Sequence, residues 1–123
     1  MNYQHLLIAV DMTDDCHTVI QRAIELANSC QARLSLVHVV EPMSMAFGGD
    51  VPMDLSALQQ QQIDQARAQL DSFTASHTEL TKDNTHLAFG QPRQEIHRLA
   101  NEQGCDLIVV GSHGRHGLAL AAT

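Results

Sequence analysis

The sequence predicts an α/β domain built around a single doubly wound, mainly parallel sheet. Short apolar runs rich in branched side chains alternate with longer segments of helical periodicity. Strands buried on both faces need such continuous apolar runs, and helical crossovers make successive strands parallel. At 123 residues the chain has the size of one domain, so we expect residues 1–123 to form it.

The first predicted unit is a strand, a helix and a second strand. Residues 5–10, HLLIAV, and residues 34–40, LSLVHVV, are the strands. Residues 13–30 begin with Thr13 and two aspartates, which suit a helix N-terminus. The apolar side chains that follow fall on one helical stripe. Together these segments predict a βαβ unit.

The middle of the chain predicts a loop and a second helix. Residues 41–56 contain two prolines and two glycines, which is typical of a long loop. From Leu58 to His77, apolar side chains recur every three or four residues, which indicates an amphipathic helix. The glutamines at residues 59–62 are interpreted as its solvated face.

Two further strands and a helix complete the prediction. Residues 85–90, THLAFG, and residues 106–111, DLIVVG, are the third and fourth strands. Pro92 suits the first turn of a helix and Gly104 its end, so a helix is expected between them. Residues 117–123, GLALAAT, predict the first turns of another helix.

The carboxyl ends of the strands are the expected ligand site, because doubly wound sheets bind ligands where the strand order reverses. The last of these ends carries three glycines at spacing three, Gly111, Gly114 and Gly117. Such a loop can turn backbone N–H groups toward a phosphate. However, this spacing matches neither the dinucleotide-binding nor the P-loop pattern, so a plain turn stays open as the alternative.

Several polar side chains near that edge have more than one interpretation. Asp11 could accept hydrogen bonds from sugar hydroxyls. Arg115 could neutralise a phosphate or be an ordinary exposed cation. His113 and His116 could hold a metal ion, although the lack of further ligands at suitable spacing leaves solvated histidines as the alternative. His38 is expected to be a core or edge histidine with its hydrogen bonds satisfied. No spacing suggests a catalytic triad, so nothing here argues for a catalyst.

Composition excludes some classes of partner and compartment. Seven Lys and Arg against fourteen Asp and Glu give a net charge of −7, and only one Tyr and three Phe are aromatic, which argues against nucleic acid. The three cysteines show no zinc spacing, so we expect reduced thiols in the cytoplasm. The N-terminal apolar run LLIAV is too short for a signal peptide or a membrane span, and no membrane partner is expected.

Three stretches of the chain resemble the universal stress protein family. They are residues 5–16, HLLIAVDMTDDC, residues 34–41, LSLVHVVE, and residues 90–117, GQPRQEIHRLANEQGCDLIVVGSHGRHG. The resemblance implies a Rossmann-like fold of the adenine nucleotide alpha hydrolase kind. It also implies binding of ATP or another adenine nucleotide, with Mg²⁺, in a stress-induced cytoplasmic homodimer that hydrolyses ATP slowly at most.

The resemblance also assigns roles to residues. By analogy, Asp11 would meet the ribose or adenine with Ala9 and Val10 beside it, and the backbone of Val39 would read the adenine edge. Val110 would line the pocket. The phosphate loop would comprise Gly111, Ser112, His113, Gly114 and Arg115.

The family's G-x2-G-x9-G-[ST] signature is only partly present. Gly111 and Gly114 match its first two glycines, and its last two positions would be 124 and 125, beyond Thr123. We therefore expect the C-terminal helix and the fifth strand to be missing and phosphate binding to be weakened. We also expect an exposed apolar edge of the sheet, which favours association. The alternative function is a non-enzymatic, dimerising interaction module that does not bind nucleotide tightly.

Overall fold

The structure alternates strands and helices along the chain. This computed structural model describes residues 3–10, 16–42, 56–111 and 118–122. The elements follow in the order β1 (His5–Val10), α1 (Cys16–Cys30), β2 (Arg33–Val40), α3 (Ser56–Ser76), β3 (Thr85–Phe89), α4 (Pro92–Gln103), β4 (Leu107–Gly111) and β5 (Leu118–Ala122). Every strand and helix predicted up to residue 111 is present, with ends within a few residues of the predicted ones.

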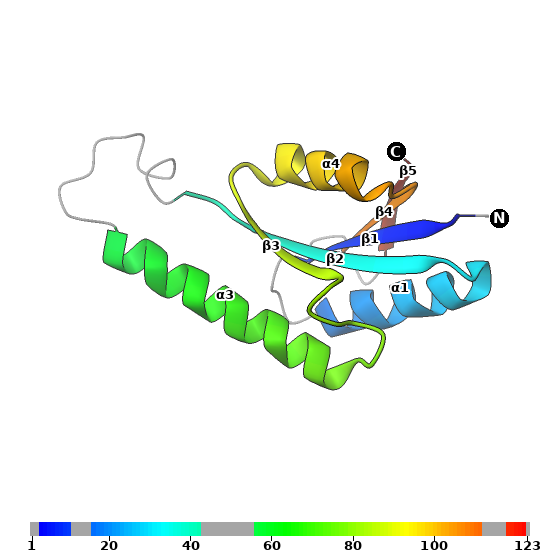
Figure 1. Ribbon diagram of the computed structural model, residues 1–123, viewed down its shortest axis with the longest axis horizontal. Coiled ribbons are helices and arrows are strands. Elements are labelled where there is room, and N and C mark those ends of the chain that lie inside the picture. The colour runs from blue at the N-terminus through cyan, green and yellow to red at the C-terminus, as the bar shows by residue number, and fades with distance from the viewer. Residues whose placement is uncertain (1–2, 11–15, 43–55, 112–117, 123) are drawn as a thin grey trace.

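The strands form one five-stranded sheet in the order β3-β2-β1-β4-β5. Strands β1 to β4 pair with one another in parallel. The chain runs outward from β1 to β3 and then returns to place β4 on the other side of β1. Helices α1 and α3 cover one face of the sheet, and α4 covers the other (Figure 1). The predicted α/β class with a doubly wound, mainly parallel sheet is therefore confirmed.

The C-terminal segment differs from the prediction. Residues Leu118–Ala122 form strand β5, which pairs antiparallel with β4, with Gly111 opposite Leu118. The expectations of a helix start and of a missing fifth strand are therefore wrong, and β5 rather than β4 is the outer strand on this side of the sheet. The edge of β4 presents backbone donors and acceptors that a nearby segment can satisfy, whereas a helix of one or two turns is marginal in water. Pairing with β4 thus outweighs the helix propensity of Leu and Ala.

Strand β1 forms the centre of the core, and all six of its residues are buried. Leu6 and Ile8 point toward α1 and α3, whereas Leu7 and Ala9 point toward α4 and contact the cluster around Leu99. The alternation follows from the two-residue period of a strand. A central strand with both faces covered must be apolar at successive positions, which explains the continuous run in the sequence.

Helix α3 is packed on the sheet only through its second half. Its buried residues are Ala66, Leu70 and Phe73, and Phe73 is completely buried. Figure 1 shows the first half extending beyond the strands. No helix among the described residues is long and apolar enough to span a membrane.

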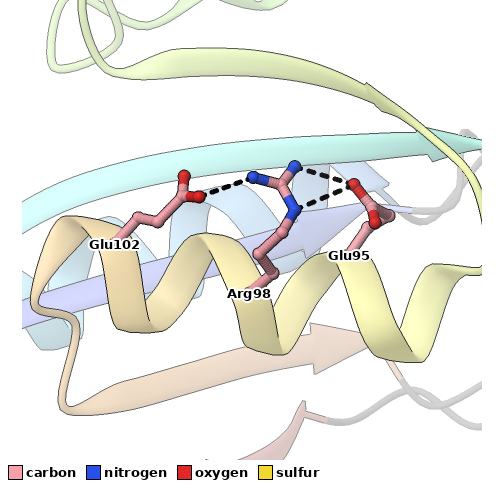
Figure 2. Close-up of polar contacts among 3 residues, drawn as sticks. All are labelled: Glu95, Arg98 and Glu102. Carbon is pink, nitrogen blue, oxygen red and sulfur yellow. Dashed lines mark hydrogen bonds and ion pairs between the residues drawn. The ribbon is translucent and has the colours of Figure 1, made fainter.

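Helix α4 has the termini that the sequence predicts. Pro92 lies in its first turn, and Gly104 ends it in the left-handed conformation, with φ 70° and ψ 32°. On its solvent side, Arg98 bridges Glu95 at 2.7 Å and Glu102 at 2.8 Å (Figure 2). Because Arg98 and Glu102 are about half exposed, these ion pairs contribute little to stability.

A polar network closes the amino edge of the sheet. The carboxylate of Asp106 accepts hydrogen bonds from the backbone N–H groups of Gln4 at 2.9 Å and His5 at 3.0 Å. The His5 ring lies between the carbonyl oxygen of Gln103, 3.1 Å from Nδ1, and the hydroxyl of Ser35, 2.7 Å from Nε2. A carbonyl only accepts, so Nδ1 carries the proton and the serine hydroxyl donates to Nε2.

This network makes stability depend on pH. Burial, with a smaller contribution from Arg33, lowers the pKa of His5 below its ordinary value of 6.5. The unfolded chain therefore takes up a proton at His5 before the folded chain does, and the contribution of His5 to stability is lost as the pH falls below about 6.5.

We expect replacement of His5 by Gln to flatten this dependence. A glutamine can still donate to Gln103 and accept from Ser35 but does not titrate. Between pH 7 and pH 5, the free energy of unfolding measured with urea should therefore fall more steeply for the wild type than for His5→Gln. Equal slopes would show that His5 is not protonated preferentially in the unfolded chain.

We expect Gly104→Ala to lower the free energy of unfolding by about 1–2 kcal/mol, the cost of a left-handed conformation for a residue with a Cβ. Apart from its chain neighbours, no heavy atom of the described residues lies within 4 Å of a Cβ built at this position, so the cost is one of backbone conformation. Gly104→Asn is the matched control, because asparagine tolerates this region better. The free energy of unfolding measured with urea should be highest for the wild type, lower for Gly104→Asn and lowest for Gly104→Ala. An alanine variant as stable as the wild type would contradict the left-handed conformation assigned to Gly104.

Candidate functional site

A cleft of about 710 Å³ lies at the carboxyl ends of β1 and β2. Helix α3 contributes one part of its wall and the start of α4 another. Residues from three strands and both helices line it: Ala9, Val10, Val37, His38, Val39, Glu41, Gln62, Gln65, Ala66, Gln69, Pro92, Ile96 and Val110. This is the edge of the sheet at which the sequence predicts a ligand.

The apolar wall of the cleft contains three of the predicted site residues. Ala9, Val39 and Val110 lie on the face of the sheet that α4 covers, together with Ile96 of that helix. Ala9 and Val110 are opposite each other in the β1–β4 pair. Because β4 lies on the other side of β1 from β2, this pair marks the point where the strand order reverses, where ligands of such sheets bind.

Val10 lines the cleft from the other face of the sheet. Its side chain belongs to the core beneath α1 and is 7% exposed. Its carbonyl oxygen lies 2.8 Å from Nδ1 of His38, which also lines the cleft. This bond gives Nδ1 of His38 a partner, and it requires the proton on Nδ1.

The backbone of Val39 faces the β1 side just past the last described pair of the β1–β2 ladder. The N–H of Gly90 donates to the carbonyl of Val40, so Val40 faces β3. Backbone groups of successive strand residues point to opposite sides, so those of Val39 face the β1 side. The last register pair between these strands is Val10 with His38. The carbonyl of Val39 therefore lies one position beyond the described end of the β1–β2 ladder, at the mouth of the cleft.

The polar part of the lining was not predicted from the sequence. Gln62, Gln65 and Gln69 border the cleft from α3, and Glu41 borders it from the end of β2. The glutamines recur at spacings of three and four, which places them on one side of the helix, but only the tertiary structure shows that this side borders the cleft. No Lys or Arg belongs to the lining among the described residues.

A tight turn brings the start of α4 to the cleft. Gly90 between β3 and α4 has φ 149°, which side chains rarely permit. A Cβ at this position would lie 3.1 Å from Cγ of Glu95. The turn lets Pro92 and Ile96 join the lining, so the backbone conformation of Gly90 helps to shape the site.

The remaining predicted site residues lie at or beyond the limit of the described structure. Gly111 is the last residue of β4 and pairs with Leu118. Asp11, Ser112, His113, Gly114 and Arg115 lie outside the described residues, as does His116. Their predicted contacts with sugar, phosphate or metal remain predictions.

Cys105 does not suggest nucleophilic chemistry, because its thiol is buried. Burial raises the pKa of the Cys105 thiol to about 11, so it stays protonated at neutral pH. Within the part of the chain that the structure describes, no three His, Cys, Asp or Glu side chains gather as a metal site would require. The described site has the features of a binding cleft: an apolar wall, a polar rim and backbone groups at its mouth.

These features define a doubly wound α/β protein with a ligand cleft at the strand-order reversal. The sequence of residues 2–121 matches the universal stress protein family, and the chain belongs to that family. The chain is 37% identical over 120 residues to universal stress protein A homolog 1 of Coxiella burnetii. This match covers 96% of this chain and 82% of that protein. Homolog 2 of the same organism is 30% identical over 97% of this chain and 82% of its own length.

Solved structures agree with the fold. A universal stress protein family member from Burkholderia pseudomallei matches with a TM-score of 0.71 and 28% identity, covering 90% of this chain and 83% of that one. Universal stress protein UspA from Lactobacillus plantarum matches with a TM-score of 0.66 over 98% of this chain and 87% of its own. At 22% identity, the second likeness shows the fold alone.

Proposed function

We propose that this chain binds an adenine nucleotide, ATP in the first place, in the cleft at the carboxyl edge of its sheet, and that it acts in the stress response as one domain spanning residues 1–123. The observation that carries the proposal is the apolar wall of Ala9, Val39 and Val110 beside the backbone of Val39, which faces the β1 side past the last described β1–β2 pair. The wall lies at the reversal of strand order, where sheets of this kind bind nucleotides.

The chemistry of the cleft suits a purine base. Ligand sites of about 300–1,000 Å³ are lined by apolar side chains with a few polar groups that fix orientation. In this proposal, the adenine ring packs on Val39 and Val110, and the carbonyl of Val39 accepts a hydrogen bond from the exocyclic amino group. Asp11, which follows β1 directly, accepts hydrogen bonds from the ribose hydroxyls.

The phosphates extend, in this proposal, toward the segment after β4. The described lining contains the carboxylate of Glu41 and no cation, so phosphates need their positive partners elsewhere. Gly111 and Gly114 offer backbone N–H groups, with Ser112, His113 and Arg115 beside them, and Mg²⁺ offsets the remaining negative charge. A universal stress protein in complex with cAMP has this fold, with a TM-score of 0.50 at 20% identity, which supports an adenine nucleotide as ligand.

We further propose that nucleotide binding, with slow hydrolysis at most, is the activity, and that the protein works in the cytoplasm as a homodimer. Strand β5 is the outermost strand on its side of the sheet. An outer strand presents a row of backbone groups to which a second copy can add its own strand. Dimerisation without tight nucleotide binding is the second candidate, and this arrangement favours it.

Replacing Val110 by Phe tests the placement of the base. A phenyl ring fills the apolar part of the cleft, so we expect ATP affinity measured by calorimetry to fall at least about tenfold. Leu58→Phe is the matched control: this residue of α3 is 43% exposed and does not line the cleft. Full affinity in a folded Val110→Phe protein would exclude this site, and no ATP binding by the wild type would favour the dimerising module.

Asp11→Ala tests the sugar contact. Loss of a hydrogen bond that leaves a ribose hydroxyl unsatisfied costs about 1–3 kcal/mol, so ATP should bind roughly tenfold more weakly or worse. Asp11→Asn keeps an acceptor oxygen and should lose less. Equal ATP affinities for all three proteins would mean that Asp11 does not touch the nucleotide.

A further inference from the structure

Two histidines from distant parts of the chain meet on the α1 side of the molecule. His17 lies in the first turn of α1, and His77 directly follows α3. Nδ1 of His17 lies 3.5 Å from Nε2 of His77, and the ring centroids are 5.7 Å apart. Figure 1 shows the end of α3 beside the start of α1. Neither histidine lines the cleft described above.

Both histidines are held through the same buried residue, Phe73. The His17 ring packs edge-on against Phe73 with a centroid distance of 5.1 Å and an interplanar angle of 86°. The backbone N–H of His77 donates to the carbonyl of Phe73 at 2.9 Å, and its own carbonyl accepts from Leu80 at 3.0 Å. Because Phe73 is completely buried, the core holds the His17 ring and the backbone of His77 close to each other.

The separation of the two nitrogens suits a shared metal ion better than a direct hydrogen bond. Good N–H hydrogen bonds are about 2.7–3.2 Å long, and this distance is 3.5 Å. Two imidazoles bound tetrahedrally to Zn²⁺, each about 2.1 Å from the ion, have nitrogens roughly 3.4 Å apart. We propose that His17 and His77 form a binding site for a divalent cation of the Zn²⁺ class.

Such a site joins two helices with two protein ligands. One nitrogen comes from each histidine, and water completes the tetrahedron, since no third side chain of ligand type gathers there among the described residues. Imidazole is a ligand that Zn²⁺, Cu²⁺ and Ni²⁺ accept, whereas Mg²⁺ and Ca²⁺ prefer oxygen. The two histidines therefore form a different kind of metal site from the proposed Mg²⁺ position beside the nucleotide, because they select cations that accept nitrogen ligands. Bound metal would tie the start of α1 to the end of α3.

Titration calorimetry with ZnCl₂ tests the site in protein without a histidine tag and without nucleotide. The second imidazole acts at a high effective concentration, which strengthens binding by about 100-fold or more over a single ligand. We therefore expect His17→Asn and His77→Asn each to weaken the Zn²⁺ affinity roughly 100-fold. His97→Asn is the matched control, because His97 is exposed on α4 away from the pair, and its affinity should equal that of the wild type.

Equal Zn²⁺ affinity of the wild type and both pair variants would overturn the proposal. Other residues, for example His113 and His116, would then have to bind the metal. Absence of Zn²⁺ binding by the wild type would overturn it as well. NMR of the unmodified protein guards against variants that fold poorly. On addition of Zn²⁺, the imidazole signals of His17 and His77 should shift while that of His97 stays in place, and unmoved signals of the pair would exclude the site.

Discussion

The rest of the structure depends on the burial of β1 on both faces and its pairing on both edges. All six of its residues are buried, and its neighbours β2 and β4 are parallel to it. A strand in this position must be reached by helical crossovers on both sides, which places α1 and α3 on one face and α4 on the other. The reversal of strand order beside β1 follows from the same arrangement.

The amino and carboxyl ends of the strands have different surroundings. At the amino edge, Asp106, His5 and Ser35 hold one another and the neighbouring backbone in a network of hydrogen bonds. At the carboxyl edge, the last described pair of β1 and β2 is Val10 with His38, and a cleft of about 710 Å³ lies there. The amino edge thus serves stability, and the carboxyl edge holds the cleft in which we propose that a ligand binds, at the place where α/β sheets bind ligands.

Helix α3 contributes to two separate places on the molecule. Its glutamines border the cleft, and its end brings His77 to His17 of α1. Phe73, completely buried, fixes this end of the helix against the core. One buried aromatic residue therefore anchors the helix that forms a wall of the cleft and also positions the proposed metal site.

The sequence alone determined the elements up to residue 111 and the edge of the sheet at which the cleft lies. Strands such as β1 are continuous apolar runs because both faces are covered, and Pro92 and Gly104 mark the ends of α4, so local chemistry was sufficient for these predictions. The resemblance of short motifs to a family placed Ala9, Val39 and Val110 at the cleft, and the structure brings these residues together there.

Only the tertiary structure decided the features that depend on contacts between distant segments. Leu118–Ala122 became a strand because β4 offered a backbone edge to pair with, which no local pattern records. The glutamines of α3 look like an ordinary solvated face until the fold places them beside the strand ends. His17 and His77 are 60 positions apart, so their 3.5 Å approach exists only because α1 and α3 pack on the same face of the sheet.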